Sequence, residues 1–284
     1  MNVVWISSYP KSGNTWVNNV LYQAGKDLGY PQEEMDVYNV MNNDKLPSIC
    51  PIINKELSNA PAIVLKTHAA YADSMHKKLN LNTVAFIHVI RNPLDVLLSY
   101  INFSRIDYRL WGNREACAKR FFIDFMGFDQ IVPYEDWLVT KLEDIPRFNL
   151  DHALEKFSMG NGKIPNVDNM SGTWFEHSES YYNARDQIPN IVLKYEDMLE
   201  DANTFIKLKD VFNIDPQTII NTVNSINERN AGFSKKGEGD RGIFYNKMAS
   251  FYYVNYFSKA TITNFIEAHQ ERLARLGYGN LPTS

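Results

Sequence analysis

The chain has 284 residues, a formal net charge of −4 and a pI near 5.9. It is long for one domain, but α/β folds reach this size as single units, so we expect one domain over residues 1–284. No basic excess points to nucleic acid or an acidic membrane surface, and no apolar run approaches the roughly 20 residues that span a bilayer.

The first predicted feature is a junction of strand, turn and helix at the N-terminus. The apolar run 3–6 predicts a strand, Pro10 a break, and the apolar spacing over 17–24 a helix. The first N–H groups of a helix lack intrahelical acceptors, and the helix dipole adds positive charge there. Together with Lys11 and the flexible Gly13, this junction predicts a cradle for phosphate or sulfonate. An ordinary turn that carries a lysine is the alternative.

The order of residues in this loop differs from that of a nucleoside-triphosphatase loop, G-x-x-x-x-G-K-[ST]. The stretch Tyr9–Trp16 reads Y-P-K-S-G-N-T-W. It resembles the 5′-phosphosulfate loop of the cytosolic-type sulfotransferases, Y-P-K-S-G-T-T-W. Those enzymes move a sulfuryl group from 3′-phosphoadenosine-5′-phosphosulfate to a hydroxyl or amine. The resemblance implies donor-binding roles for Lys11, Ser12, Gly13, Asn14, Thr15 and Trp16, with Lys11 also catalytic, Trp16 facing the adenine and Asn14 in place of a threonine.

A second candidate group follows the apolar run 62–65, which predicts a buried strand that ends in Lys66-Thr67-His68. Open α/β sheets bind ligands at the carboxyl ends of their strands, and histidine is the usual general base near neutral pH. A lone histidine is more often structural. The family that the first loop resembles has the same K-T-H triplet after a strand, and this implies that His68 is the base and that Lys66 lies beside the transferred group.

The run 84–90 is the clearest predicted strand, and we expect His88 inside it to be a core residue. Arg91 follows directly, and Asn92-Pro93 suits the start of a helix. The stretch R-N-P-L-D-V-L-L-S-Y from Arg91 resembles the family's 3′-phosphate segment, R-N-P-x-D-x-x-x-S-x. This implies that Arg91 and Ser99 bind that phosphate, for which the planar guanidinium is well suited.

A further strand is predicted over 190–195, after a helical stretch over 170–185 in which His177 is a candidate for an acceptor pocket. Apolar strands that alternate with helices predict an α/β protein with a parallel sheet. The resemblance implies a P-loop-like three-layer fold with a central parallel β-sheet flanked by helices. Tyr195 begins Y-E-D-M, which resembles the family's Y-E-D-[LM], whose tyrosine approaches the adenine.

The C-terminal part predicts helices over 203–212, 216–226 and 259–276, with a glycine-rich loop over 230–246. Within that loop, K-K-G-E-G-D-R resembles the family's R-K-G-x-x-G-D-W-K, with one residue fewer between the glycines. By itself this would be a solvated charged loop. The resemblance implies contacts with the 3′-phosphate from Lys235, Lys236, Gly237 and, as a weaker match, Ser225.

Taken together, these resemblances imply a cytosolic-type sulfotransferase similar to bacterial members, with a small-molecule acceptor, such as a phenol. We expect no metal, nucleic acid or membrane. Cys50 and Cys117 give no disulfide framework or metal spacing, and no signal peptide is evident, so we expect the cytoplasm. The oligomeric state stays open. The alternatives are an Mg²⁺-dependent nucleotide kinase of P-loop type and a non-catalytic nucleotide-binding protein.

Overall fold

The computed structural model describes residues 2–29, 38–39, 62–71, 82–111, 115–167, 169–236 and 249–284. The chain divides into two compact units. The first unit consists of Met1–Arg91 and His177–Asn230, and the second of Asn92–Glu176 and Ala231–Ser284.

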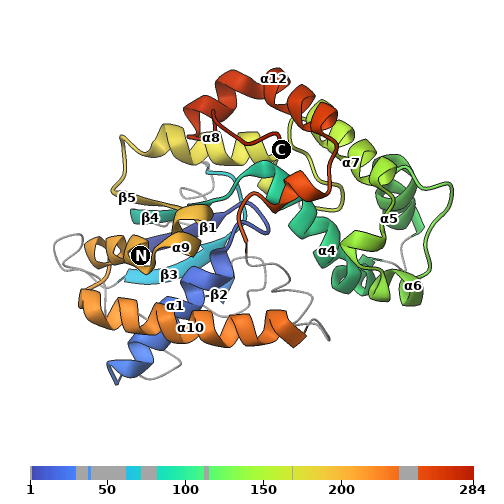
Figure 1. Cartoon of the computed structure of the whole chain (residues 1–284). Coiled ribbons are helices and arrows are strands. Elements are labelled where there is room, and N and C mark those ends of the chain that lie inside the picture. The colour runs from blue at the N-terminus through green and yellow to red at the C-terminus, as the bar shows by residue number, and fades with distance from the viewer. Residues whose placement is uncertain are drawn as a thin grey trace. The chain divides into compact units, whose positions relative to one another are not determined.

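In the described part of the chain, the first unit contains a five-stranded parallel sheet in the order β2-β3-β1-β4-β5 (Figure 1). Ser7 of β1 is in register with Thr67 of β3 and with His88 of β4, so these strands end at the same edge. The strands are β1 (Asn2–Ser8), β2 (Tyr38–Asn39), β3 (Ala62–Thr67), β4 (Asn82–Ile90) and β5 (Asn190–Lys194).

Helices cover both faces of this sheet. Successive side chains of a strand point to opposite faces, so one strand packs against both helical layers. Val4 and Ile6 of β1 pack in the core with α1, α9, η5 and α10, whereas Val3 and Trp5 pack with α8. The result is a three-layer arrangement of helix, sheet and helix. These helices are α1 (Asn14–Asp27), α8 (Trp174–Ala184), α9 (Tyr195–Glu200), the 3-10 helix η5 (Ala202–Asp210) and α10 (Pro216–Lys236).

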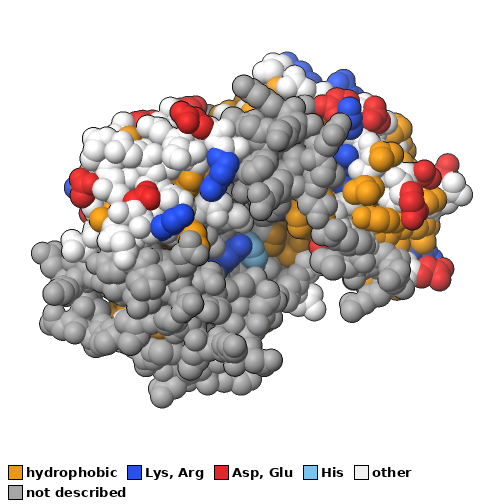
Figure 2. Space-filling model, turned by 90° about the horizontal axis from the view of Figure 1, so that it is seen from below, with side chains coloured by type: hydrophobic (Ala, Val, Ile, Leu, Met, Phe, Trp, Pro, Cys, Tyr) orange, Lys and Arg blue, Asp and Glu red, His pale blue; other side chains and the backbone are white. Residues whose placement is uncertain are grey.

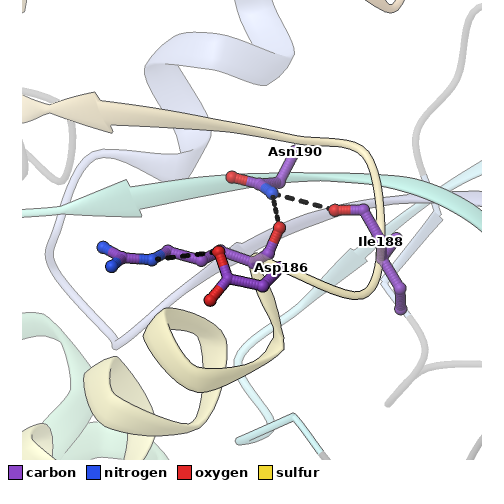
Figure 3. A network of polar contacts seen from close by, with 4 residues as sticks. Asp186, Ile188 and Asn190 are labelled. Carbon is purple, nitrogen blue, oxygen red and sulfur yellow. Dashed lines mark hydrogen bonds and ion pairs between the residues drawn. The ribbon is translucent and has the colours of Figure 1, made fainter.

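A polar turn connects α8 to β5 (Figure 3). The Asn190 amide donates to the carbonyl oxygens of Arg185 at 2.6 Å and of Ile188 at 2.8 Å, and Arg185 pairs with Asp186 at 3.7 Å. These bonds hold the first residue of β5 beside the end of the helix.

The second unit is helical in its described part. Asn92 Oδ1 accepts from the Asp95 N–H at 2.8 Å and caps the helix that starts at Pro93, as the sequence predicts. The buried Asp95 carboxylate accepts from the N–H groups of Phe251 and Tyr253. The elements are α4 (Pro93–Trp111), α5 (Glu115–Lys119), the π-helix η2 (Arg120–Phe125), α6 (Tyr134–Val139), α7 (Arg147–Met159), α12 (Lys259–Arg275) and the 3-10 helices η3 (Leu142–Asp144), η4 (Asn169–Ser171) and η6 (Tyr252–Asn255).

The predicted strands and the parallel α/β class are confirmed, but two boundaries differ. Tyr195, predicted as the last residue of a strand, is the first residue of α9. Helix α10 does not end near Ile226 but continues to Lys236, so Lys235 and Lys236 belong to a helix rather than to a loop. Gly237 lies outside the described residues. Within the described chain, no helix has both the length and the apolar character to cross a bilayer.

Candidate functional site

The candidate site is built around the loop that leads from β1 into α1. The Ser12 N–H donates to the Tyr9 carbonyl at 3.2 Å, and the Trp16 N–H donates to the Gly13 carbonyl at 2.9 Å. Lys11 has a φ of 70°, which residues other than glycine rarely adopt. Backbone strain of this kind collects at ligand-binding loops, where the surrounding structure enforces it.

Arg91 and Tyr195 pack directly against this loop. The Arg91 guanidinium lies 3.9 Å from the centroid of the Tyr195 ring, and its Nη1 donates to the Lys11 carbonyl at 3.3 Å. A Cβ on Gly13, whose φ is 110°, would lie 2.7 Å from the Tyr195 ring. Glycine is therefore required here both by the backbone and by the approach of the tyrosine.

Ser12 and Asn14 are both buried in the loop but differ in their hydrogen bonds. Among the described residues, Ser12 Oγ has no partner, which is costly for a buried hydroxyl and fits a bound anion that accepts from it. Asn14 Nδ2 instead donates to the carbonyls of Ile6 at 3.2 Å and Thr67 at 3.3 Å. Asn14 thus connects the loop to the ends of β1 and β3.

His68 lies immediately after β3, and its ring orientation is set by a backbone group. Its Nδ1 is 2.7 Å from the Ser8 carbonyl oxygen. A carbonyl can only accept, so Nδ1 carries the proton and Nε2 keeps its lone pair. Burial and the charges of Lys66 and Lys11 lower the pKa of His68 to about 4, although the bond to Ser8 opposes this shift. The ring is therefore a neutral acceptor at pH 7.

The lysine of the same triplet is also partly buried. Burial lowers the pKa of Lys66 from its ordinary value. Figure 2 shows a His side chain and several Lys and Arg side chains exposed on one face of the molecule. The positive charges of Lys66 and Lys11 both contribute to the lowered pKa of His68.

The remaining predicted residues lie in different surroundings. Trp16 is 5% exposed and packs edge-on against Tyr195 with ring centroids 5.8 Å apart, so its contact with an adenine stays a prediction. Thr15 and Ser99 are half-buried in the first turn of α1 and in α4, and Ser225 is exposed on α10.

Tyr181, which bonds to the Ala69 carbonyl, belongs to a cluster of aromatic and histidine side chains that was not predicted from the sequence. His88 is buried, as predicted; its Nδ1 is 3.2 Å from Ser7 Oγ, and it stacks on Tyr181 with centroids 4.7 Å apart. His177 is fully buried beside both rings, and a role in an acceptor pocket stays a prediction. No sequence signal distinguished Tyr181 from an ordinary core aromatic.

No group of three or more His, Cys, Asp or Glu side chains could hold a metal ion in the part of the chain that the structure describes. The polar groups at the loop are instead the side chains of Lys11 and Arg91, backbone N–H groups and the Ser12 hydroxyl. These groups suit an anionic ligand.

Comparison with known proteins establishes the family. The sequence profile of the sulfotransferase domain matches residues 2–277, and the chain belongs to that family. Sulfotransferase 4A1 of the mouse is 26% identical over 214 residues, which cover 72% of this chain and 57% of the relative. The amine sulfotransferase of the rabbit is 26% identical over 208 residues, which cover 72% of this chain and 53% of the relative. The chain thus spans little more than half the length of these relatives.

A solved structure with the same fold is that of the mouse sulfotransferase SULT7A1 complexed with PAP. It superposes with a TM-score of 0.56 at 19% sequence identity and covers 98% of this chain and 86% of that one. The parallel sheet between helical layers is therefore the P-loop-like α/β fold of the sulfotransferases, as predicted.

Proposed function

We propose that this protein transfers a sulfuryl group from 3′-phosphoadenosine-5′-phosphosulfate to a hydroxyl or amine of a small-molecule acceptor. The observation that carries this proposal is the neutral His68, which presents an unprotonated Nε2 in the local field of two lysines and next to an anion-binding loop. Membership of the sulfotransferase domain family supports it.

The residues of the loop fit the donor. The 5′-phosphosulfate would be held by the Ser12 hydroxyl, which has no partner in the described part of the chain, together with the N–H groups from Gly13 to Thr15 and the Lys11 ammonium. Arg91, together with Ser99, would hold the 3′-phosphate. Tyr195 and Trp16 would border the adenine. Contacts from Lys235, Lys236, Gly237 and Ser225 remain part of the proposal.

The bound donor would supply the sulfuryl group, which passes from the 5′-phosphate oxygen to the acceptor oxygen or nitrogen. His68 Nε2 takes the acceptor proton as the new bond to sulfur forms and the old S–O bond breaks. Lys11 and Lys66 stabilise the negative charge that develops on the leaving phosphate and the sulfuryl oxygens. The lysines and the helix N-terminus can supply this positive charge without a metal.

Three further expectations, on the domain, the acceptor and the location of the protein, go with this proposal. The match over residues 2–277 supports one sulfotransferase domain over 1–284. A phenol is one candidate acceptor, since the predicted base would activate a weakly acidic hydroxyl. We propose the cytoplasm as the location of the protein.

The proposal is tested by calorimetric titration with adenosine 3′,5′-bisphosphate, beside 5′-AMP and beside ATP with and without Mg²⁺. We expect tight binding of the bisphosphate that is weakened in Arg91→Ala and Lys11→Ala. Transfer of labelled sulfate from the donor to an acceptor panel then follows, with His68→Ala as the control. Preference for ATP with Mg²⁺, with no effect of the 3′-phosphate, would refute the proposal in favour of a kinase. Bisphosphate binding without transfer to any acceptor would favour a binding protein.

A further inference from the structure

The segment that carries His68 continues as Ala69–Tyr71, and α8 holds this segment at two points. The Tyr181 hydroxyl donates to the Ala69 carbonyl at 3.2 Å. The Tyr71 N–H donates to Ser180 Oγ at 2.8 Å. Because Ala69 adjoins His68, the first of these bonds restrains the Ala69–Ala70 peptide, one residue beyond the proposed base.

His68 is also held by the end of β1. Its Nδ1 donates to the carbonyl of Ser8, at the end of β1. The ring thus has one anchor on its own nitrogen and a second on the backbone that follows it. Only the first anchor sets the tautomer, and the second sets where the ring is.

Tyr181 is itself rigidly placed. It is 3% exposed, and its ring stacks on His88 at an interplanar angle of 10° and meets Phe86 and Tyr71 at centroid distances of 5.3 and 5.7 Å. Burial raises the pKa of Tyr181, so the hydroxyl keeps the proton that it donates. A donor packed closely on several sides can fix the position of its acceptor.

We propose that Tyr181 is a positioning residue for the proposed base, acting on His68 through the Ala69 carbonyl. This inference rests on the proposed function. Tyr181 does not need to touch donor or acceptor, so its effect should fall on turnover rather than on binding of the nucleotide. A role in core packing alone would instead lower stability and leave turnover per folded molecule unchanged.

The test compares Tyr181→Phe with Tyr182→Phe. The first variant removes the hydroxyl and keeps the ring. The second makes the same chemical change at the next residue, which is half-buried and carries the Arg185 guanidinium 3.7 Å from its ring centroid. For Tyr181→Phe we expect kcat to fall by about tenfold, since small displacements of catalytic groups cost up to about a hundredfold. Affinity for adenosine 3′,5′-bisphosphate should not change, and Tyr182→Phe should match the parent.

A double-mutant cycle with His68→Ala separates positioning from packing. If Tyr181 acts through His68, Tyr181→Phe should cost nothing further once the imidazole is gone. Equal fractional losses in both backgrounds, or no loss in the parent background, would overturn the inference. If Tyr181→Phe does not fold, Ser180→Ala removes the neighbouring bond to Tyr71, and the same cycle decides.

Failure of the proposed function can be told apart from failure of this inference. The imidazole signals of His68, assigned by their loss in His68→Ala, can be followed by NMR in the protein without substrate. We expect Tyr181→Phe to shift or broaden them and Tyr182→Phe to leave them unchanged. If the parent transfers no sulfuryl group, the proposed function fails, while unshifted His68 signals in Tyr181→Phe would refute the positioning role in any case.

Discussion

The guanidinium of Arg91 lies 3.9 Å from the centroid of the Tyr195 ring, although the two residues follow different strands. The contact arises from the sheet, because Ile90, the last residue of β4, is in register with Lys194, the last residue of β5. The residues that follow them, Arg91 and Tyr195, therefore lie next to each other. A cation over an aromatic face is held in place while its remaining N–H groups stay oriented. Because Arg91 also bonds the Lys11 carbonyl, it joins the end of β4 to the loop between β1 and α1.

This geometry predicts that lysine cannot replace Arg91. A lysine lacks the planar fork that stacks on Tyr195 and donates to the Lys11 carbonyl at the same time. We expect Arg91→Lys to weaken binding of adenosine 3′,5′-bisphosphate by about tenfold or more, as for loss of one charge-assisted hydrogen bond. Binding of 5′-AMP, which lacks the 3′-phosphate, should change less. Calorimetry on both ligands checks this, and equal losses for the two would contradict a role at the 3′-phosphate.

The second prediction concerns the pH dependence of turnover. Since the pKa of His68 is lowered to about 4, its neutral form is the major one above that pH. The rate should therefore be nearly flat from pH 7 down to about pH 5, and it should fall tenfold per pH unit below about 4. A pH–rate profile of kcat/KM measures this. In His68→Ala the rate should be lower by about 10²–10⁴, and the acid limb should vanish. An acid limb centred near 6.5 in the parent would contradict the lowered pKa.

The third prediction concerns acid stability. Burial lowers the pKa of His88 to about 3, below its unfolded value near 6.5. The unfolded state therefore binds the proton first, so stability is complete above about pH 6.5 and declines as the pH falls toward 3. Urea unfolding of the parent between pH 7 and 4 should show this decline.

The variant His88→Phe keeps an aromatic ring for Tyr181 to stack on but cannot titrate. Its stability should depend less steeply on pH over the same range, even if it is less stable at pH 7. His152→Phe is the control, because that ring belongs to α7 in the other unit. Parallel curves for His88→Phe and the parent would contradict the assignment.

The fourth prediction concerns Gly13. Alanine at this position would bring its Cβ to 2.7 Å from the Tyr195 ring and would keep a φ of 110°. We expect Gly13→Ala to lower the free energy of unfolding by about 1–3 kcal/mol from backbone strain, and by more from the clash. Gly29→Ala is a matched control, since Gly29 has a φ of 83° but no atom within 4 Å of the added Cβ. Equal losses in urea unfolding would show that Tyr195 contributes nothing.

The fifth prediction concerns Asn14. In Asn14→Asp, an oxygen would replace the amide nitrogen that donates to Ile6 and Thr67. Two hydrogen bonds would be lost, and a buried charge would face two carbonyls, so we expect a loss of about 2 kcal/mol or more. Asn221→Asp is the control, because its side-chain oxygen accepts from Gln217 at an exposed site and can still do so. Urea unfolding of the two variants decides, and similar small losses would contradict the connecting role of Asn14.

The sequence by itself predicted the strands, most of the helices and the family. Continuous apolar runs predicted the parallel strands, because a sheet covered on both faces admits few polar residues. The order of residues in the loop after β1 and the segment from Arg91 predicted the family, since both are short motifs that lie within a few neighbouring residues of the chain. These features could be predicted because each is encoded by residues that are close together in the sequence.

The tertiary structure alone decided how these segments act on one another. Register between strands brings Arg91 onto Tyr195, and no local pattern encodes a pairing of residues more than a hundred positions apart. Burial and the Ser8 carbonyl set the protonation and tautomer of His68, which the residue type leaves open. The packing of α8 on the sheet brings the Tyr181 hydroxyl to the Ala69 carbonyl. Each of these depends on distance in space and on exclusion of water, which the chain acquires only when it folds.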